Sequence, residues 1–364
     1  MEIIAAVEQF ITSGRVIDCR EYGHGNINTT YLVTLDRKTE SHFILQRINT
    51  RVFHHPERVM LNMRIATDHA RMRREQIRMG ADRRWEVPRV ITARDGRDHW
   101  DAPDGSFWRA ISFIDDTVSF DTIKDIRHAE EVGYALGMFH TLLSDLPPES
   151  LLDTLEGFHI TPGYLKHYHD VLSAYRHGRS PEIDYCTEFV RERSVLAHVL
   201  ENAKEQGRLL QRTVHGDPKV NNILIDNVTG HAAGIIDLDT VKPGLVHYDI
   251  GDCLRSGCNP VGEETAQWRD VRFDTGICRA ILKGYLSVAK GFLTESDFEY
   301  LYDSVRLLAF ELGLRFFTDY LEGNVYFKIS GPEHNLVRAL VQFKLTESIE
   351  SQEKPIRRII ADLR

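Results

Sequence analysis

The stretch His215-Gly-Asp-Pro-Lys-Val-Asn-Asn222-Ile-Leu, followed by Ile235-Ile-Asp237-Leu-Asp239, decides the fold. Asp217 and Asn222 are separated by four residues on a loop that leads into a short apolar strand, and Asp237 closes the next such strand. A hairpin between the two strands brings Asp237 back beside Asn222. Two carboxylates about 6 Å apart repel each other by roughly 3 kcal/mol at an effective dielectric near 20, so the pattern predicts a cation between them.

The donor atoms in this pattern favour Mg²⁺. Asn222 and Asp237 offer the oxygen ligands that Mg²⁺ takes, and Mg²⁺ also binds substrate phosphates. Asp217 stays outside the metal shell and is placed to accept a proton from a hydroxyl nucleophile. This division of roles predicts phosphoryl transfer of the kinase type, with ATP as the donor. Asp239 is either a turn cap or a further acid of the cluster, and His215 is interpreted as a scaffold residue that holds the loop.

A glycine pair precedes the first β-rich run, in the stretch Tyr22-Gly-His-Gly25-Asn-Ile-Asn28. Because glycine allows close approach of the backbone, we predict that this loop covers the phosphates of ATP. The loop lacks the lysine of a Walker loop, which argues against a P-loop NTPase.

The residues before about position 115 predict a small sheet with one inserted helix. Short β-rich runs alternate with polar turns, and Pro56 is suited to the first turn of a helix whose apolar residues recur at helical spacing. The predicted strands are Tyr31–Leu35, Phe43–Ile48, Trp85–Arg94 and Ser106–Ile114, and the predicted helix is Pro56–Met79.

From about position 127 the pattern becomes helical. The predicted helices are Ala129–Leu143, Asp184–Gln206 and Thr294–Tyr320, and two β-like pieces cover Asn222–Asp226 and Ala233–Asp237. We therefore predict an α+β fold of two lobes that divide near Asp115 and Asp116. A small, antiparallel, β-rich nucleotide-binding lobe takes residues 1–115, and a larger, mainly helical lobe with the catalytic loop takes residues 116–364.

The composition fits this interpretation and excludes several classes of protein. The chain has 364 residues, enough for two domains, and its formal net charge of −9 argues against a nucleic-acid partner. No stretch reaches the roughly 18 apolar residues of a membrane span, and the first residues suit an amphipathic helix rather than a secretory signal. The five cysteines are odd in number and sparse, which indicates a reducing, cytoplasmic compartment. No obligate protein partner is evident.

These motifs resemble a known superfamily. HGDPKVNNILID together with IIDLDTVKPGLVHYDIGD is similar to the aminoglycoside phosphotransferases and choline kinases, which share a two-lobed, protein-kinase-like fold. More closely, the chain resembles the N-acetylhexosamine 1-kinases, through GHGNINTTYLVT, FILQRIN, LRFFTDYLEGNVYF and PEHNLVR. The resemblance implies ATP- and Mg²⁺-dependent phosphorylation of the anomeric hydroxyl of N-acetylglucosamine or N-acetylgalactosamine. The alternative is a kinase of the same fold that acts on a homoserine, choline or aminoglycoside hydroxyl.

The resemblance also implies roles for individual residues around the nucleotide. Asp217 is the expected catalytic base, and Asn222 and Asp237 are the expected Mg²⁺ ligands. Asp249 is expected to anchor the catalytic loop. The expected nucleotide contacts are Gly25, Asn26 and Asn28 in the phosphate loop, Arg47 or, in the other register, Gln46 on the phosphates, and Phe113 and Ile114 in a hinge from Ser112 to Asp115. We prefer Arg47 over Gln46 because Arg47 carries the charge.

A sugar pocket is expected on the helix near residue 315. The resemblance implies substrate contacts from Arg315, Asp319 and Tyr320, besides Asp217, and from His24 in the phosphate loop. An arginine can fork its donors onto a sugar hydroxyl or an acetamide oxygen. Binding of a cationic acceptor would instead require an acidic pocket, which the net charge of −9 permits.

Overall fold

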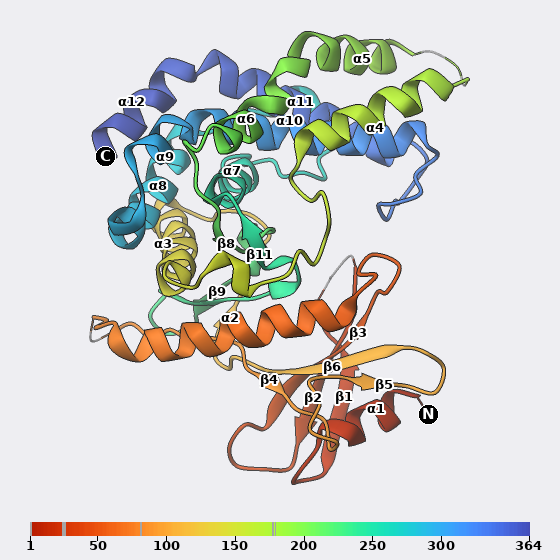
Figure 1. Ribbon diagram of the computed structural model, residues 1–364, viewed down its shortest axis with the longest axis vertical. Coiled ribbons are helices and arrows are strands. Elements are labelled where there is room, and N and C mark those ends of the chain that lie inside the picture. The colour runs from red at the N-terminus through yellow and green to blue at the C-terminus, as the bar shows by residue number, and fades with distance from the viewer. Residues whose placement is uncertain (1, 24–26, 81, 177, 179) are drawn as a thin grey trace.

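An antiparallel sheet forms the first part of the chain, with strand order β1-β2-β3-β6-β4 and β5 on the edge of β6 (Figure 1). The computed structural model describes residues 2–23, 27–80, 82–176, 178 and 180–364. The strands are β1 (Val16–Glu21), β2 (Thr29–Leu35), β3 (His42–Ile48), β4 (Val90–Ile91), β5 (Trp100–Asp101) and β6 (Phe107–Ser112). The predicted β2–β3 hairpin is confirmed.

The two faces of this sheet have different neighbours, because successive strand residues point to opposite sides. Phe43 and Leu45 of β3 pack with Phe10 of helix α1 (Glu2–Phe10), so α1 covers one face. Gln46 and Ile48 point to the other face, toward the rest of the molecule. The parity of a residue in β3 therefore decides whether it faces α1 or the interior.

One predicted strand is mostly wrong. Trp85–Arg94 has β propensity, but only Val90–Ile91 pairs with the sheet. The preceding residues form no strand, although the carbonyl of Arg89 still accepts from the amide of Ser112 in β6. The amide of Glu86 instead donates to the carbonyl of Ala233, 2.7 Å away, in a later strand. This segment thus joins the sheet to the helical part.

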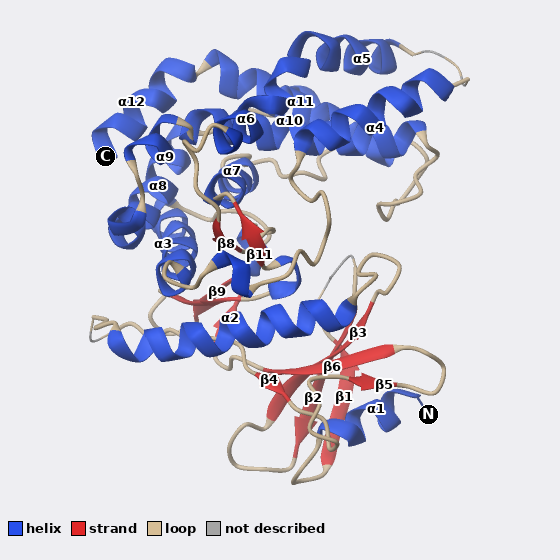
Figure 2. Cartoon of the chain, viewed as in Figure 1, coloured by secondary structure: helices blue, strands red, loops and turns tan. Residues whose placement is uncertain are grey.

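The larger part of the chain is helical, which confirms the α+β prediction (Figure 2). Its helices are α3 (Ile126–Leu143), α4 (Thr161–Ala174), α5 (Pro181–Arg193), α6 (Val199–Glu205), α7 (Val246–Gly257), α8 (Thr275–Ala289), α9 (Glu295–Glu299), α10 (Leu301–Leu321), α11 (His334–Ser351) and α12 (Glu353–Leu363). Its short strands are β7 (Thr117–Val118), β8 (Arg212–Val214), β9 (Ile223–Asp226), β10 (Ala232–Ile235) and β11 (Lys242–Gly244).

Two predicted helices are each divided in two. The predicted helix Asp184–Gln206 is interrupted by a 3₁₀ turn at Ser194–His198, which buries Leu196 and Ala197. The predicted helix Thr294–Tyr320 starts with the short helix α9, and α10 begins only after Tyr300. Helical periodicity continues across the first break, because Phe189 and Leu200 on its two sides belong to one buried cluster.

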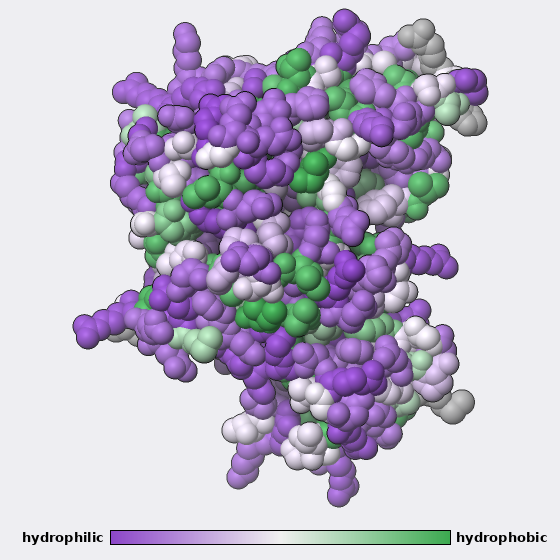
Figure 3. Space-filling model, in the orientation of Figure 1, coloured by the Kyte–Doolittle hydropathy of each residue, from purple (hydrophilic) through white to green (hydrophobic). Residues whose placement is uncertain are grey.

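Helix α2 (Pro56–Gln76) lies across the junction between the sheet and the helices (Figure 1). It confirms the predicted helix, which ends three residues earlier than expected. Met63, Ala66 and Ala70 of α2 share one buried cluster with residues of α3 and α8, so a continuous core connects the two parts. The face shown in Figure 3 is mostly hydrophilic, with apolar residues in small groups. Among the described residues, no helix is both long and apolar enough to cross a bilayer.

Helices α3 and α8 approach each other backbone to backbone. A Cβ atom on Gly133 of α3 would lie 1.9 Å from the carbonyl oxygen of Ile281, and one on Gly284 of α8 would lie 1.9 Å from that of Glu130. Real Cβ contacts are much longer, so both positions require glycine for this packing.

We predict that Gly133→Ala lowers the free energy of unfolding by at least about 2 kcal/mol, because the helices must separate to admit a methyl group. Gly163→Ala in the first turn of α4 is the matched control, since its Cβ would meet nothing within 4 Å. That control should be neutral or stabilising by up to about 1 kcal/mol. Chemical denaturation of both variants checks this, and equal stabilities would contradict the close packing of α3 on α8.

Candidate active site

The loop between β8 and β9 is held by one buried carboxylate. Asp249 in the first turn of α7 accepts hydrogen bonds from the amides of His215 (2.6 Å) and Gly216 (2.8 Å). His140 of α3 contacts the same carboxylate at 2.8 Å. Burial alone would raise the pKa of Asp249, but these hydrogen bonds outweigh it and lower the pKa. The expected anchoring role of Asp249 is confirmed.

Gly216 turns the loop at a place where no side chain fits. Its φ angle is +87°, and a Cβ atom there would lie 2.8 Å from the Cβ and carbonyl oxygen of Thr240. The hydroxyl of Thr240 donates to the carbonyl of His215 over 2.7 Å. The glycine therefore lets the loop lie directly on the segment that follows Asp237.

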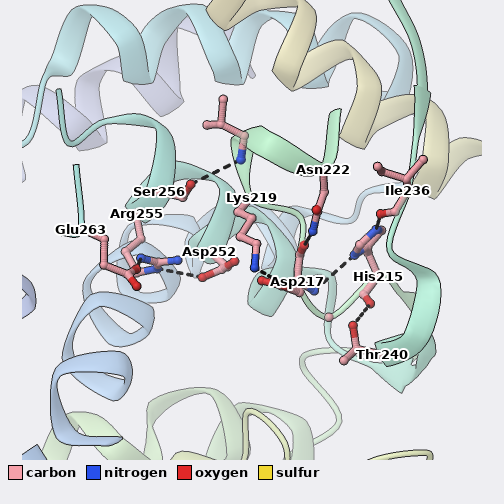
Figure 4. Close-up of polar contacts among 12 residues, drawn as sticks. His215, Asp217, Lys219, Asn222, Ile236, Thr240, Asp252, Arg255, Ser256 and Glu263 are labelled. Atoms are coloured by element: carbon pink, nitrogen blue, oxygen red, sulfur yellow. Dashed lines mark hydrogen bonds and ion pairs between the residues drawn. The ribbon is translucent and has the colours of Figure 1, made fainter. Parts of the chain in front are cut away.

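Asp217 is positioned through its backbone and its carboxylate (Figure 4). Its amide donates to Nδ1 of His215 (3.2 Å), whose Nε2 donates to the carbonyl of Ile236 (2.9 Å). Burial lowers the pKa of His215, which suits this neutral, hydrogen-bonded scaffold. The ammonium of Lys219 lies 2.8 Å from Oδ2 of Asp217, and the nearby carboxylate of Asp217 raises the pKa of Lys219.

The predicted metal ligands are brought together by the β9–β10 hairpin. Ile223 pairs with Ile235, and the amide of Ile236 donates to the carbonyl of Asn222 over 2.9 Å. Nδ2 of Asn222 donates to the carbonyl of Asp217 (2.8 Å), which leaves the amide oxygen Oδ1 for a ligand. Asp237 follows in the left-handed region, at φ +66°.

The electrostatics of this cluster fit a bound cation. Burial, with added repulsion from Asp239 and Asp217, raises the pKa of Asp237 to about 7. Within the described part of the chain, no group of three His, Cys, Asp or Glu side chains could hold a metal ion. A metal here would therefore be held by Asp237, the oxygen of Asn222 and phosphate oxygens, which is a donor set that suits Mg²⁺.

Asp239 is the centre of a second, buried network. Its carboxylate forms an ion pair with Arg109 of β6, both side chains being almost inaccessible, and it accepts from Nδ2 of Asn28 over 2.6 Å. Arg109 also donates to the amide oxygen of Gln46 (2.9 Å and 2.6 Å). Asp239 is thus an acid of the cluster and its side chain does not cap a turn.

Arg47 does not join this network. It lies on the face of β3 that α1 covers, and its guanidinium is exposed and pairs with Glu2 at 3.5 Å. Gln46, the alternative register, points to the interior and contacts Arg109. The preference for Arg47 over Gln46 is therefore corrected, because strand parity directs Arg47 away from Asp217 and Asp237.

The other expected nucleotide contacts are only partly described. Ile114 is buried after β6, and the ring of Phe113 lies edge-on to Tyr22 at 5.7 Å. Their contact with adenine stays a prediction. The expected contacts Gly25 and Asn26, and the expected sugar contact His24, lie outside the described residues.

Arg315 of α10 is surrounded by aromatic rings. Its guanidinium carbon lies 5.2 Å from the ring centroid of Phe158, 4.9 Å from that of Tyr164 and 5.5 Å from that of Phe327. Among the described residues, no hydrogen-bond acceptor or carboxylate pairs with this guanidinium. The donors of Arg315 therefore remain available to a ligand.

Asp319 and Tyr320 are used within the protein. Asp319 is buried, and its carboxylate accepts from the amides of Val325 (2.9 Å), Tyr326 (2.7 Å) and Phe327 (3.0 Å) and from Nδ2 of Asn335 (2.8 Å). These four bonds saturate it, so we correct the expected sugar contact: Asp319 holds the loop that carries Phe327. Tyr320 points to Glu333, with 3.4 Å between their side-chain oxygens.

The structure thus brings together Asp217, Asn222, Asp237 and Asn28, and it separates Arg47 and Tyr320 from them. Two charged residues of the site were missed by the sequence analysis. Lys219 could have been found from its place two residues after Asp217. Arg109 could have been found only from strand pairing, because it lies opposite Gln46 on β6.

Comparisons with known proteins identify the family and confirm the fold. The model of the phosphotransferase enzyme family (APH) matches residues 18–285. The structure of a microcompartment-associated aminopropanol kinase matches with a TM-score of 0.65 at 18% identity, over 96% of this chain and 98% of that one. A choline/ethanolamine kinase family protein from Mesorhizobium loti matches with a TM-score of 0.58 at 14% identity, over 100% and 99%. The GDP complex of aminoglycoside 2′-phosphotransferase-IIIa matches with a TM-score of 0.54 at 13% identity, over 99% and 98%. The two-lobed, protein-kinase-like fold is confirmed.

We predict that Asp237→Asn stabilises the metal-free protein at neutral and alkaline pH. The folded pKa of Asp237, about 7, lies above its unfolded value. Its ionisation on rising pH therefore disfavours the folded state, and the advantage of the variant should grow from about pH 4 to about pH 7 and then stay constant.

Melting temperatures measured in a chelator across this pH range check the prediction, with Asp18→Asn on exposed β1 as the control. Adding Mg²⁺ and ADP should raise the melting temperature of the wild type and not that of Asp237→Asn. A constant difference between variant and wild type at every pH would contradict the assigned ionisation.

Proposed function

Because the chain belongs to the phosphotransferase enzyme family, we propose that it transfers the γ-phosphoryl group of ATP to the anomeric hydroxyl of an N-acetylhexosamine. The observation that carries the choice of acceptor is the unpaired guanidinium of Arg315 within its three aromatic rings. Such a guanidinium suits a neutral acceptor that offers a carbonyl or hydroxyl oxygen. The apolar face of a sugar ring also suits the neighbouring aromatic rings.

The carboxylates around Arg315 support a neutral acceptor rather than a cationic one. Glu311, one turn earlier on α10, already binds His159 and Thr161. The charge of Asp252 of α7 is already compensated by Arg255, 2.8 Å from its Oδ1, while its Oδ2 has no hydrogen-bond partner among the described residues. An amino alcohol or aminoglycoside would need a carboxylate that is free to pair with its ammonium group, since a buried unpaired charge is costly. This argument favours the sugar over the choline-like and aminoglycoside alternatives.

Asp217 is the proposed base of the transfer. Lys219 engages one of its carboxylate oxygens, and the other can accept the hydrogen bond of the anomeric hydroxyl, which is more acidic than an ordinary alcohol. The oxygen then attacks the γ-phosphorus in line, the bond from that phosphorus to the β,γ-bridging oxygen breaks so that ADP leaves, and the proton of the hydroxyl passes to Asp217. Because Lys219 stays protonated beside Asp217, its ammonium can also stabilise the negative charge on the transferring phosphoryl group.

Asn222 and Asp237 are the proposed ligands of Mg²⁺ on the nucleotide phosphates. When bound there, the metal ion would supply positive charge that neutralises the phosphate oxygens. Nδ2 of Asn222 donates to the backbone carbonyl of Asp217, so one hydrogen bond joins the proposed metal ligand to the proposed base. This contact would hold the proposed metal ligand Asn222 close to the proposed base Asp217.

Arg109 is the proposed phosphate-orienting cation in place of Arg47. It lies on the interior face of the sheet, where Gln46 and Asp239 orient its guanidinium. Its Nη1 atom has no hydrogen-bond partner among the described residues, and it is the one donor group of Arg109 left for the nucleotide. Asp239, rather than an acid on α2, is the acidic partner of Arg109 in this proposal.

The acceptor is tested with a panel of hydroxyl compounds and ATP, measured as ADP release. We expect turnover of N-acetylglucosamine or N-acetylgalactosamine, and ³¹P and ¹H NMR of the product should place the phosphate on the anomeric oxygen. Asp217→Asn should lower kcat by about 10²- to 10⁴-fold with an unchanged melting temperature, because only the base is removed. Turnover of choline, homoserine or an aminoglycoside, with none of the N-acetylhexosamines, would reverse the proposal.

A second prediction separates the two arginines of the sheet. Arg109→Gln should lower kcat/KM for ATP by about 10- to 100-fold, because a charge-assisted contact to phosphate is lost. Arg47→Gln, the matched control from the opposite face, should stay within about twofold of the wild type. Melting temperatures identify any loss that comes from unfolding, and an equal loss in both variants would contradict the assignment of Arg109.

A further inference from the structure

His159 connects the catalytic loop to the helix that carries Arg315. It lies just before α4, is buried, and has a φ angle of +63°, which is unusual for a residue with a side chain. Its Nε2 lies 2.7 Å from the carbonyl oxygen of Gly216, and its Nδ1 lies 2.8 Å from Oε1 of Glu311. Both contacts are short enough to be strong hydrogen bonds.

The two partners of His159 determine its protonation. The carbonyl oxygen of Gly216 can only accept a hydrogen bond. Glu311 is ionised, because its contacts with His159 outweigh burial and lower its pKa, and its other oxygen already accepts from the hydroxyl of Thr161 at 2.6 Å. Both ring nitrogens must therefore donate, which only the charged imidazolium can do.

The surroundings of His159 favour that charge. Burial lowers its pKa, but Glu311 and, more weakly, Asp252 of α7 outweigh burial, so the pKa lies above its ordinary value. The ring of Tyr248 of α7 stacks on the imidazole at 5.5 Å. Arg315, one turn beyond Glu311 on α10, is a nearby cation, and it contributes to lowering the pKa of Glu311.

The hydrogen bonds of His159 lie where they can affect the position of the base. The amide of Gly216 is bound by Asp249, and its carbonyl is bound by His159, so the two peptide groups of this residue, which precedes Asp217, are both held. Glu311 and Arg315 are one turn apart and share a face of α10. The contact therefore fixes the base relative to the acceptor site.

We propose that His159 is a positioning residue for phosphoryl transfer: its charged ring ties the carbonyl of Gly216, beside the base Asp217, to Glu311 on the helix that carries Arg315. This inference rests on the proposed function only in taking Asp217 as the base, and it holds for any acceptor that the site turns over.

The proposal implies a loss of rate on the alkaline side. As pH rises through the raised pKa of His159, the ring loses a proton and can keep only one of its two hydrogen bonds. The loop is then less firmly held, so kcat should fall while KM for ATP stays nearly constant. His159→Gln should lower kcat by about 10- to 100-fold at neutral pH and remove this pH dependence.

Glu311 gives the sharper test, through two substitutions of different chemistry. In Glu311→Gln, the amide can donate to Nδ1 of a neutral ring and still accept from Thr161, so both bonds of His159 persist without its charge. We expect this variant to lose the alkaline decline in kcat between about pH 6 and about pH 10. Glu311→Ala leaves the ring without its partner and should resemble His159→Gln.

A matched control is available on the same two elements. Glu322 at the end of α10 pairs with the exposed His167 of α4 at 3.1 Å. Glu322→Gln should keep the pH profile of the wild type, because an exposed pair contributes little and does not contact the loop. An unchanged alkaline decline in Glu311→Gln would overturn the proposal and leave His159 a purely structural role.

The protonation state is measured independently of turnover. ¹⁵N NMR of histidine-labelled protein, with the His159→Gln spectrum used to assign the signal, should show both ring nitrogens of His159 protonated at about pH 7. A neutral ring there would overturn the proposal whatever the acceptor proves to be. Failure of the N-acetylhexosamines as substrates, with the Glu311→Gln and NMR results as expected, would overturn only the choice of acceptor.

Discussion

The structure depends on the hydrogen bonds by which Asp249 holds two consecutive amides of the catalytic loop. This carboxylate is fully inaccessible, and it binds the amides of His215 and Gly216 while His140 contacts it from α3. Leaving such a carboxylate without partners would cost several kcal/mol, so the loop follows it closely. The direction of Asp217, and its place relative to the proposed metal ligands Asn222 and Asp237, follow from where α7 places this one side chain.

The acids around the site differ in whether a protein cation pairs with them. Asp217 has Lys219 and Asp239 has Arg109, whereas the carboxylate of Asp237 has neither hydrogen bond nor ion pair among the described residues. Burial and the repulsion of Asp239 and Asp217 raise the pKa of Asp237. A cation that binds there meets a carboxylate that has no protein partner to displace, which is the physical basis for assigning Mg²⁺ to this position.

The sequence predicted the parts of the site whose geometry is local. Asp217 lies on the loop before β9 and Asp237 lies just after β10, and the pairing of these two strands follows from a short-range pattern. The first sheet and the long helix α2 were predicted from short-range patterns too. The choice of Arg47 failed, because strand parity is set by which face α1 covers. The role of Arg109 follows from the strand order, and that of Asp319 follows from a loop that folds back onto its own helix. Neither feature can be predicted from one stretch of sequence.

The ion pair between Arg109 and Asp239 has a consequence for regulation. In protein kinases the phosphate-binding lysine pairs with a glutamate on a mobile helix, so displacement of that helix switches catalysis off. Here the acid comes from the segment after Asp237, and α2 is itself tied down, since Asn62 donates to the carbonyls of Leu152 and Val241. A displacement of α2 would therefore act on Asp239 through the backbone that Asn62 holds, rather than by carrying the acid itself away from Arg109.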